Sequence, residues 1–328
     1  MPGIRLIAGS GRSGTTWVQD ALATANGLRP VFEPLHPYVS ALGNRFAHRA
    51  LGPDDDHPDL VQFLNEVCAG RRNRFWTLYR RQRRWLLPPS DEFSTMQDAV
   101  RVYRRWGKFL KELPRLAAAG RRGEPLVKCI RANLMLGWLS RRLGCRTVLV
   151  VRHPGAVIES ELRGGWNAQF ALDRYRRDAK LHELTGDRYR TLLDRQMTPI
   201  ETLAARWVIE NQWVVEGAAA NGVTVVYYEH LKSSPDREWQ RIRVALELEK
   251  APPLEVIVRP SQQSAPKKSA AGGIGDEPRW LRALSRDYLG RIQGVLDNAG
   301  VELYTMSEPE PRDSFRRAKV DSGAGIAP

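Results

Sequence analysis

The sequence predicts an α/β fold, and two stretches carry that prediction. Residues 4–8 form a short apolar run, which a glycine-rich turn joins to a segment with helical spacing. Residues 147–151 form an uninterrupted run rich in β-branched side chains, typical of a parallel strand buried on both faces. Pro154 is well placed to begin a helix shortly afterwards. Strands that are each followed by a helix are expected to lie parallel in one sheet.

The composition allows one large α/β domain or two small ones. The chain has 328 residues, of which 42% are hydrophobic, and this supports a substantial core. No apolar run is long enough to span a bilayer, and we find no signal peptide, so we expect a cytoplasmic protein without a membrane span. Its three cysteines, Cys68, Cys129 and Cys145, have neither metal-ligand nor disulfide spacing.

The formal net charge of +14 favours polyanionic partners. A nucleotide, an anionic acceptor, a nucleic acid or an anionic membrane would all be attracted. A solvated, arginine-rich surface explains the charge equally well, so the charge by itself identifies no partner.

The loop after the first strand predicts a phosphate-binding site. Its glycines allow a tight turn, and the helix expected over residues 16–25 adds a partial positive charge at its start. The spacing from Gly9 to Gly14 is that of a Walker A loop, but Thr15 stands where that motif has its lysine. The cation is Arg12, inside the loop. A nucleoside triphosphatase needs the lysine at its outer phosphates, so the substitution argues against that activity.

A second short strand is expected at residues 30–32 and ends at Glu33. An acidic residue at the end of a strand beside a phosphate loop is a candidate general base. The ordinary alternative is a glutamate that caps a helix or forms a salt bridge. His36 lies on the same loop and is the second candidate for the base.

Residues 38–125 predict a helical insertion between the second and third strands. Residues 71–89 within it are dense in arginine and aromatic side chains. Three interpretations stay open: an amphipathic helix with its aromatic side chains inward, a lid over an acceptor, and a nucleic-acid surface.

A second anion-binding group is expected further along the chain. The strand at residues 147–151 ends at Arg152, and Ser160 follows eight residues later, inside the next helix. Because α/β sheets place ligands at the carboxyl ends of their strands, these two side chains can hold one phosphate from two sides. A salt bridge for Arg152 and a helix-surface position for Ser160 are the alternatives. Lys128, on the strand expected at residues 126–130, either adds a cation or lies at the surface.

Together the two stretches resemble sulfotransferases that use 3′-phosphoadenosine 5′-phosphosulfate (PAPS). Arg12-Ser13-Gly14-Thr15-Thr16 is similar to the family's 5′-phosphosulfate loop, and Arg152 with Ser160 matches its 3′-phosphate motif. Residues 227–231 resemble the family's Tyr-Glu-Asp-Leu segment, with His230 in place of the aspartate. The resemblance covers residues 4 to about 231.

The resemblance implies a three-layer sandwich around a central parallel sheet of about five strands, similar to P-loop nucleotide-binding proteins. One domain would cover residues 1–306, followed by a loose tail at residues 307–328. PAPS would be the co-substrate and the acceptor a small molecule or glycan, such as a sugar, phenol, lipid or secondary metabolite. We expect neither a nucleic-acid partner nor a metal, since the sequence shows no acidic pair for one. The oligomeric state stays open.

The resemblance also implies residue roles. Phenol and steroid sulfotransferases carry a loop lysine and a third-strand histidine base, where this chain has Arg12 and Ile130. It is more similar to tyrosylprotein, carbohydrate and bacterial members, so Glu33 would be the base. Arg12 would stabilise the leaving phosphate, and Lys128 would add a cation. The residues expected to bind the nucleotide are Gly11, Arg12, Ser13, Gly14, Thr15, Thr16, Trp17, Arg152, Ser160, Tyr228, Lys267 and Lys268.

Within that set, Tyr228 is expected to line the adenine, flanked by Trp17 or Trp207, although both tryptophans fit a core position as well. Lys267 and Lys268 lie in a polar loop that either closes over the nucleotide or is disordered. Further helices are expected at residues 134–143, 199–220 and 280–299, and a strand with a turn at residues 223–231.

Two functions from other classes compete with this interpretation. A P-loop kinase of small metabolites shares the first loop but needs a lysine and a magnesium-binding acid, and we find neither in place. A basic nucleic-acid-binding protein organised around residues 71–84 explains the charge but neither anion motif.

Overall fold

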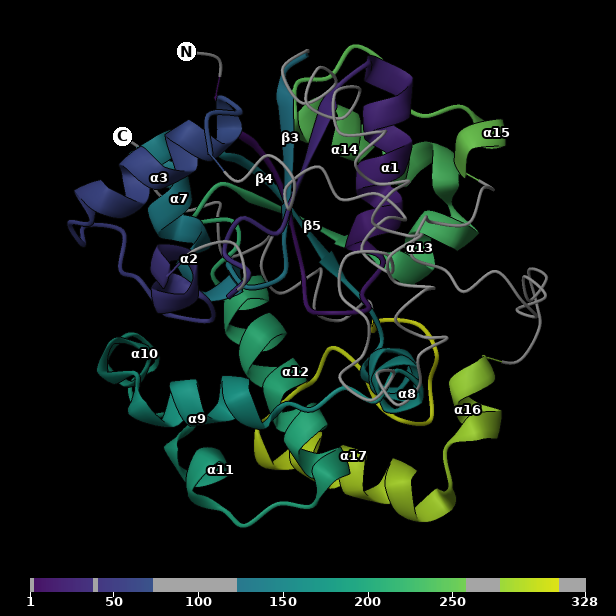
Figure 1. Cartoon of the computed structure of the whole chain (residues 1–328). Helices are drawn as coiled ribbons and strands as arrows, with labels where there is room; N and C mark the ends of the chain where they lie inside the picture. Colours follow the sequence, from purple (N-terminus) through teal and green to yellow (C-terminus); the bar gives the residue numbers. More distant parts are fainter. Residues whose placement is uncertain (1–2, 38–40, 73–122, 258–277, 313–328) are drawn as a thin grey trace, which may run out of the picture.

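The computed structural model describes residues 3–37, 41–72, 123–257 and 278–312 (Figure 1). Several predicted features lie outside these ranges: most of the insertion, most of the tail, Lys267 and Lys268. Within the described residues, no helix is both long enough and apolar enough to cross a membrane.

Five parallel strands form the central sheet, in the order β2-β3-β1-β4-β5. The strands are β1 (Arg5–Ala8), β2 (Arg29–Phe32), β3 (Pro125–Cys129), β4 (Arg146–Val151) and β5 (Val223–Tyr227). The order brings β2 beside β3 and β4 beside β1. Because all neighbouring strands pair in parallel, the carboxyl ends of all five strands lie along one edge of the sheet. The predicted parallel α/β sheet is confirmed.

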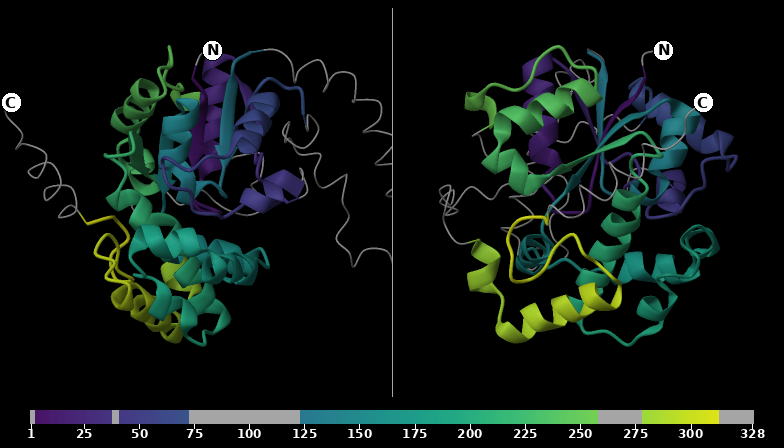
Figure 2. Two further views of the ribbon diagram at one scale, coloured as in Figure 1. Left: turned by 90° about the vertical axis from the view of Figure 1, so that its left-hand side faces the viewer. Right: turned by 180° about the vertical axis from the view of Figure 1, so that it is seen from behind.

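Alternation along each strand builds two cores. Leu6 and Leu149 belong to one buried cluster, while their neighbours Ile7 and Val148 belong to the other. Successive side chains of a strand point to opposite faces, so each apolar strand needs a helical layer on both sides. Figure 2 shows the sheet between two such layers.

The helices of the two layers flank the sheet in Figure 1. One layer contains α1 (Thr15–Asn26), α13 (Tyr228–Ser233), α14 (Pro235–Ala245) and α15 (Leu254–Ile257). The other contains α2 (Ala41–Phe46), α3 (Pro58–Cys68), η1 (Asn133–Met135) and α7 (Leu136–Leu143). The described part of the predicted insertion, which includes α2 and α3, is therefore helical.

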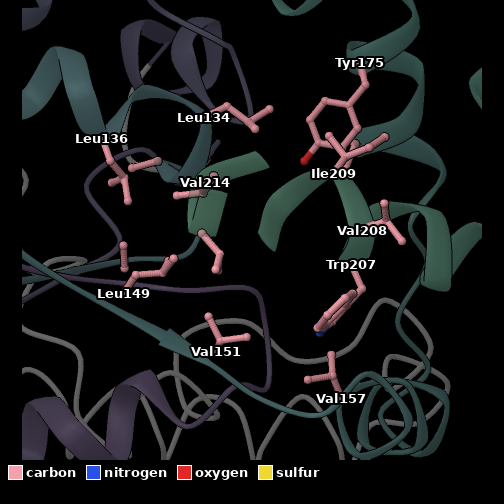
Figure 3. Packing of buried hydrophobic residues seen from close by; sticks show 14 of the residues in the cluster. Leu134, Leu136, Leu149, Val151, Val157, Tyr175, Trp207, Val208, Ile209 and Val214 are labelled. Carbon is pink, nitrogen blue, oxygen red and sulfur yellow. The ribbon is translucent and has the colours of Figure 1, made fainter. Parts of the chain in front are cut away.

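A further group of helices lies beyond the carboxyl end of β4. It comprises α8 (Pro154–Arg163), α9 (Gln169–Arg177), α10 (Ala179–Thr185), α11 (Arg190–Asp194), α12 (Pro199–Glu216), α16 (Arg279–Ala283) and α17 (Arg286–Asn298). The first turn of α12 is fixed by Glu201, whose carboxylate accepts a hydrogen bond of 2.8 Å from the amide of Thr198. Trp207 of α12 packs on β4 and α8, near Val151 and Val157 (Figure 3).

Two helix predictions differ from the structure at their ends. The single helix expected over residues 280–299 is two helices, α16 and α17. Leu284 is extended, with ψ 135°, and the side chain of Ser285 accepts a hydrogen bond from the amide of Tyr288, which starts a new helix. The helix expected at residues 199–220 ends at Glu216.

We expect Leu149→Ala to lower the free energy of unfolding by about 2 to 5 kcal/mol, because Leu149 of β4 is fully buried and its truncation leaves a cavity in the core. Leu254→Ala is the matched control, since Leu254 is 63% exposed and should change stability by less than about 0.5 kcal/mol. Urea unfolding followed by circular dichroism measures both. Equal effects of the two substitutions would contradict the assigned core.

Candidate active site

The loop between β1 and α1 leaves the first turn of α1 without a side-chain cap. Gly14 precedes the helix with φ 97°. Ser13 instead closes the loop on itself, because its hydroxyl donates a hydrogen bond of 2.7 Å to the carbonyl of Ser10. The amides at the start of a helix have no partner inside the helix, so this end favours an anionic ligand.

The structure brings the two predicted anion-binding stretches together. The Arg12 Nε donates a hydrogen bond of 2.8 Å to the Ser160 hydroxyl. The Arg152 guanidinium donates one of 3.1 Å to the Arg12 carbonyl, across 140 residues of sequence. Residues from the β1–α1 loop, the end of β4 and the middle of α8 thus form one site.

Positive charge is concentrated at this site. Burial lowers the pKa of Arg12, and the neighbouring guanidinium groups of Arg163 and Arg152 lower it further. Glu161 and Glu159 oppose that effect only in part. The Nε of Arg152 is buried and has no hydrogen-bond partner among the described residues. Such a site gains stability from an anion that both neutralises the charge and accepts a hydrogen bond.

Tyr228 packs between the loop and Arg152. The Arg152 guanidinium lies 4.2 Å from the centroid of the Tyr228 ring. A Cβ atom at Gly14 would come within 2.6 Å of the same ring, so only glycine allows this contact. Trp17 meets Tyr228 edge to face, with their centroids 5.6 Å apart.

Trp207 is a core residue rather than a flanking one. It is fully buried, and its indole Nε1 donates a hydrogen bond of 3.0 Å to the Arg152 carbonyl. Figure 3 shows it among apolar side chains of α8, α12 and β4. Of the two tryptophans that the sequence offered, Trp17 is the one that contacts Tyr228.

Glu33 follows β2 and lies in a pocket of cations. Its carboxylate accepts hydrogen bonds of 2.6 Å from Lys128 Nζ, 2.7 Å from Arg131 and 3.1 Å from the amide of Ile130. Glu33 is 1% exposed, and its backbone is left-handed, with φ 48°. Burial by itself would raise the pKa of Glu33, but Lys128 and Arg131 outweigh it and hold the pKa below its usual range. His36 is also buried, and its amide donates to the Glu33 carbonyl.

A second buried polar cluster lies beside the loop and was not predicted from the sequence. Its members are Glu161, Arg206, Glu210, Tyr175 and His48. Arg206 contacts both glutamates, and burial raises the pKa of Glu161 to about 7 in spite of that contact. Because the members come from α8, α9, α12 and the segment after α2, no local sequence pattern links them.

Asn133 ties this cluster to the β1–α1 loop. Its side-chain oxygen accepts a hydrogen bond of 3.2 Å from the Gly9 amide, and its side-chain nitrogen donates one of 2.9 Å to the Glu210 carbonyl. The described residues contain no group of three or more His, Cys, Asp or Glu that could hold a metal ion.

Two solved structures align with almost the whole chain. The sulfotransferase domain from the curacin biosynthetic pathway covers 100% of this chain and 99% of its own, at 14% identity and a TM-score of 0.40. The sulfotransferase domain from the Synechococcus PCC 7002 olefin synthase covers 99% and 95%, at 19% identity and a TM-score of 0.37. No protein-family model and no curated protein matches the sequence. Because both TM-scores are low, we assign no function from these similarities.

We expect Glu33→Gln to lower the free energy of unfolding by about 3 to 5 kcal/mol at pH 7, because it leaves Lys128 and Arg131 buried without their anion. The folded pKa of Glu33 lies below the ordinary value of 4.5, so its contribution is complete above that pH and is lost as the pH falls through the folded value. The difference between the two proteins should therefore shrink in acid. Urea unfolding from pH 3 to 7 measures it, with exposed Glu302→Gln as the control. A constant difference across that range would contradict the ion pairs.

Proposed function

We propose that this protein is a sulfotransferase that transfers the sulfuryl group of PAPS to a hydroxyl group of an acceptor. The observation that carries the proposal is the joining of Arg12, Arg152 and Ser160 at one site. PAPS has a 5′-phosphosulfate and a separate 3′-phosphate, and it therefore needs two anion-binding groups at a fixed separation. The β1–α1 loop supplies the first, and Arg152 with Ser160 supplies the second.

The residues present fit this co-substrate in three respects. The uncapped start of α1 offers backbone amides to the 5′ end. The unpartnered, buried Nε of Arg152 offers a donor to the 3′-phosphate. Tyr228 lies beside both groups and offers an aromatic surface to the adenine. Thr15 and Thr16 occupy the first turn of α1, where their amides and hydroxyls would face the same end.

The chemistry follows from the charges. In the proposed step the acceptor oxygen attacks sulfur in line with the bond that breaks, and the bridging oxygen leaves with the phosphate. Arg12 and the amides of α1 stabilise the negative charge on that leaving oxygen. The sulfuryl group carries less charge than a phosphoryl group, so we predict that no metal is required. The acceptor class, among sugars, phenols, lipids and secondary metabolites, is left to a screen.

Glu33 as the general base stays a prediction. Its ionised carboxylate is in the right protonation state to accept a proton, and Lys128 beside it is the cation proposed for the sulfuryl group. Each oxygen, however, already accepts a charged donor, so a base role requires that Lys128 or Arg131 release one of them. His36 stays the second candidate for the general base.

The proposal is tested first by calorimetric binding of adenosine 3′,5′-bisphosphate without magnesium. We expect tight binding of this nucleotide and much weaker binding of AMP, since the lost contacts to a charged phosphate are each worth about 1.5 to 3 kcal/mol. Arg152→Ala should weaken the bisphosphate about 10- to 100-fold and leave AMP almost unchanged. Arg141→Ala, at a 65% exposed side chain, is the control. Equal, weak binding of all nucleotides would overturn the proposal.

We expect Glu33→Gln to abolish turnover and to leave bisphosphate affinity within about twofold, because Glu33 contacts Lys128 and Arg131 and not the residues proposed to bind the nucleotide. Release of the bisphosphate from PAPS measures turnover, at a temperature where the variant is folded. Near-normal rates would remove Glu33 from the chemistry, and His36→Asn would be the next variant.

A further inference from the structure

Backbone strain marks three residues at the carboxyl end of the sheet. Five non-glycine residues in the described part of the chain have a positive φ. Arg12 (64°) and Glu33 (48°) belong to the proposed active site, and the amide of His48 (59°) bonds Arg131 beside Glu33. The other two are Asp187 and Glu247. Left-handed backbone at bulky side chains is costly and concentrates at functional sites. Arg12 and Glu33 already have proposed roles, whereas His48 has none.

His48 lies next to the Glu33 cluster. Its amide donates a hydrogen bond of 2.9 Å to the carbonyl of Arg131, the same residue whose guanidinium holds Glu33. The imidazole is mostly buried, with its side chain 11% exposed. One of its aromatic neighbours is Phe170, which is 50% exposed and whose ring centroid lies 6.5 Å away, edge to face. The ring thus lies at the border between the buried cluster and solvent.

The buried neighbours define the tautomer of His48. Its Nδ1 is 3.2 Å from Tyr175 Oη and 3.2 Å from Glu210 Oε1. Tyr175 donates its own proton to the same Glu210 oxygen, at 2.9 Å. Both groups can therefore only accept from Nδ1, so Nδ1 carries the hydrogen and Nε2 carries the lone pair. No residue in the described ranges makes a hydrogen bond with Nε2.

The surrounding charges keep this imidazole neutral. Burial lowers the pKa of His48 below its usual value, and Glu210 opposes this only in part. Arg131 and Arg206 lower it further, from the end of β3 and from α12. Arg174 of α9 packs against the segment that carries His48, and its guanidinium donates a hydrogen bond of 3.1 Å to the carbonyl of Ala47. A neutral imidazole with a free Nε2 at pH 7 is a competent general base.

We propose that His48, oriented by Glu210, accepts the proton of the acceptor hydroxyl, and that Glu33 serves as the anion that holds Lys128 and Arg131. This inference rests on the proposed sulfuryl transfer and changes only its proton acceptor. The acceptor's O–H proton passes to His48 Nε2 as its oxygen forms the new bond to sulfur. The S–O bond to the 5′-phosphate breaks, and its electron pair stays on the phosphate oxygen beside Arg12.

The fold holds this pair at a fixed distance from the donor site. Asn133 bonds the loop amide of Gly9 and the backbone of Glu210, so the loop and the helix that carries Glu210 share one anchor. Glu210 itself is a positioning residue, because it touches only protein groups. A general base must lie within hydrogen-bond reach of the proton that it removes. The contacts of Asn133 fix the position of Glu210, which orients His48, relative to the β1–α1 loop.

The tautomer can be measured without an acceptor. We expect ¹⁵N NMR of histidine-labelled protein to show one histidine, absent from the spectrum of His48→Asn, with a protonated Nδ1 and an unprotonated Nε2 at pH 7. Detection of the Nε2–H tautomer, or of an imidazolium at this pH, would overturn the proposal. Asparagine is the replacement of choice, because it tolerates left-handed backbone and keeps an N–H donor for Glu210.

Activity is then measured with the hydroxyl compound that the wild-type protein sulfates fastest in a screen of phenols, sugars and lipids. His48→Asn should lower kcat/KM by about 10²- to 10⁴-fold and leave bisphosphate affinity unchanged. His48→Gly, which also suits the positive φ, should lose as much and recover activity with added imidazole. His182→Asn, a partly buried histidine on α10, is the control. Wild-type rates in His48→Asn, or no imidazole rescue, would overturn the proposal.

The pH profile distinguishes the two bases and the role of Glu210. With His48 as the base, wild-type kcat/KM should fall as the pH drops through the folded pKa of His48, which burial holds below the ordinary imidazole value of 6.5. Glu210→Gln should lower the rate and move that limb to lower pH, because Glu210 raises the pKa of His48. An acid limb that does not move in Glu210→Gln would favour Glu33 as the base. A wild-type protein that binds the bisphosphate but sulfates nothing would overturn the proposed function, and His48's role with it.

Discussion

The contact between Arg12 and Ser160 is the interaction on which the proposed site depends. Neither the β1–α1 loop nor the β4–α8 turn forms a two-anion site by itself. The order of strands puts β4 directly beside β1, and the parallel register brings both strand ends to the same edge. The hydrogen bonds of Arg12 and Arg152 then join the two turns across that edge. A ligand with two phosphate groups can use both only because this separation is fixed.

Buried charge is the second organising constraint. Glu33 after β2, Glu161 of α8 and Glu210 of α12 are all almost fully buried, and each has an arginine or lysine beside it. Removing a partner would leave an uncompensated charge in a poorly solvated place, so these pairs specify one arrangement of the strand ends. The same pairs divide the carboxylates by protonation: Glu33 and Glu210 have lowered pKa values, while burial raises that of Glu161. Such division is common where proton transfer occurs.

The sequence predicted the parts of the structure that are local. The five strands, the glycine turn, Arg12 and the pair Arg152 and Ser160 all follow from short patterns of apolar residues and from helix starts. It did not predict that Lys128 and Arg131 enclose Glu33, because that contact depends on β2 lying beside β3. The contact between His48 and Glu210 could not be predicted either, because it depends on how α9, α12 and the segment after α2 pack, and these are remote from one another in sequence. The break at Ser285 was missed because an apolar periodicity continues through it.

The cluster of arginines around the loop has a consequence for how the protein responds to salt. Burial is the main cause of the lowered pKa of Arg12, and repulsion from Arg163 and Arg152 lowers it further. Dissolved ions screen that repulsion and would stabilise the fold, while the same ions compete with an anionic ligand and would weaken its binding. Stability and affinity would therefore change in opposite directions with ionic strength. Both a bound anionic ligand and a high salt concentration would reduce the repulsion between these arginines. Only the ligand would do so at one defined position.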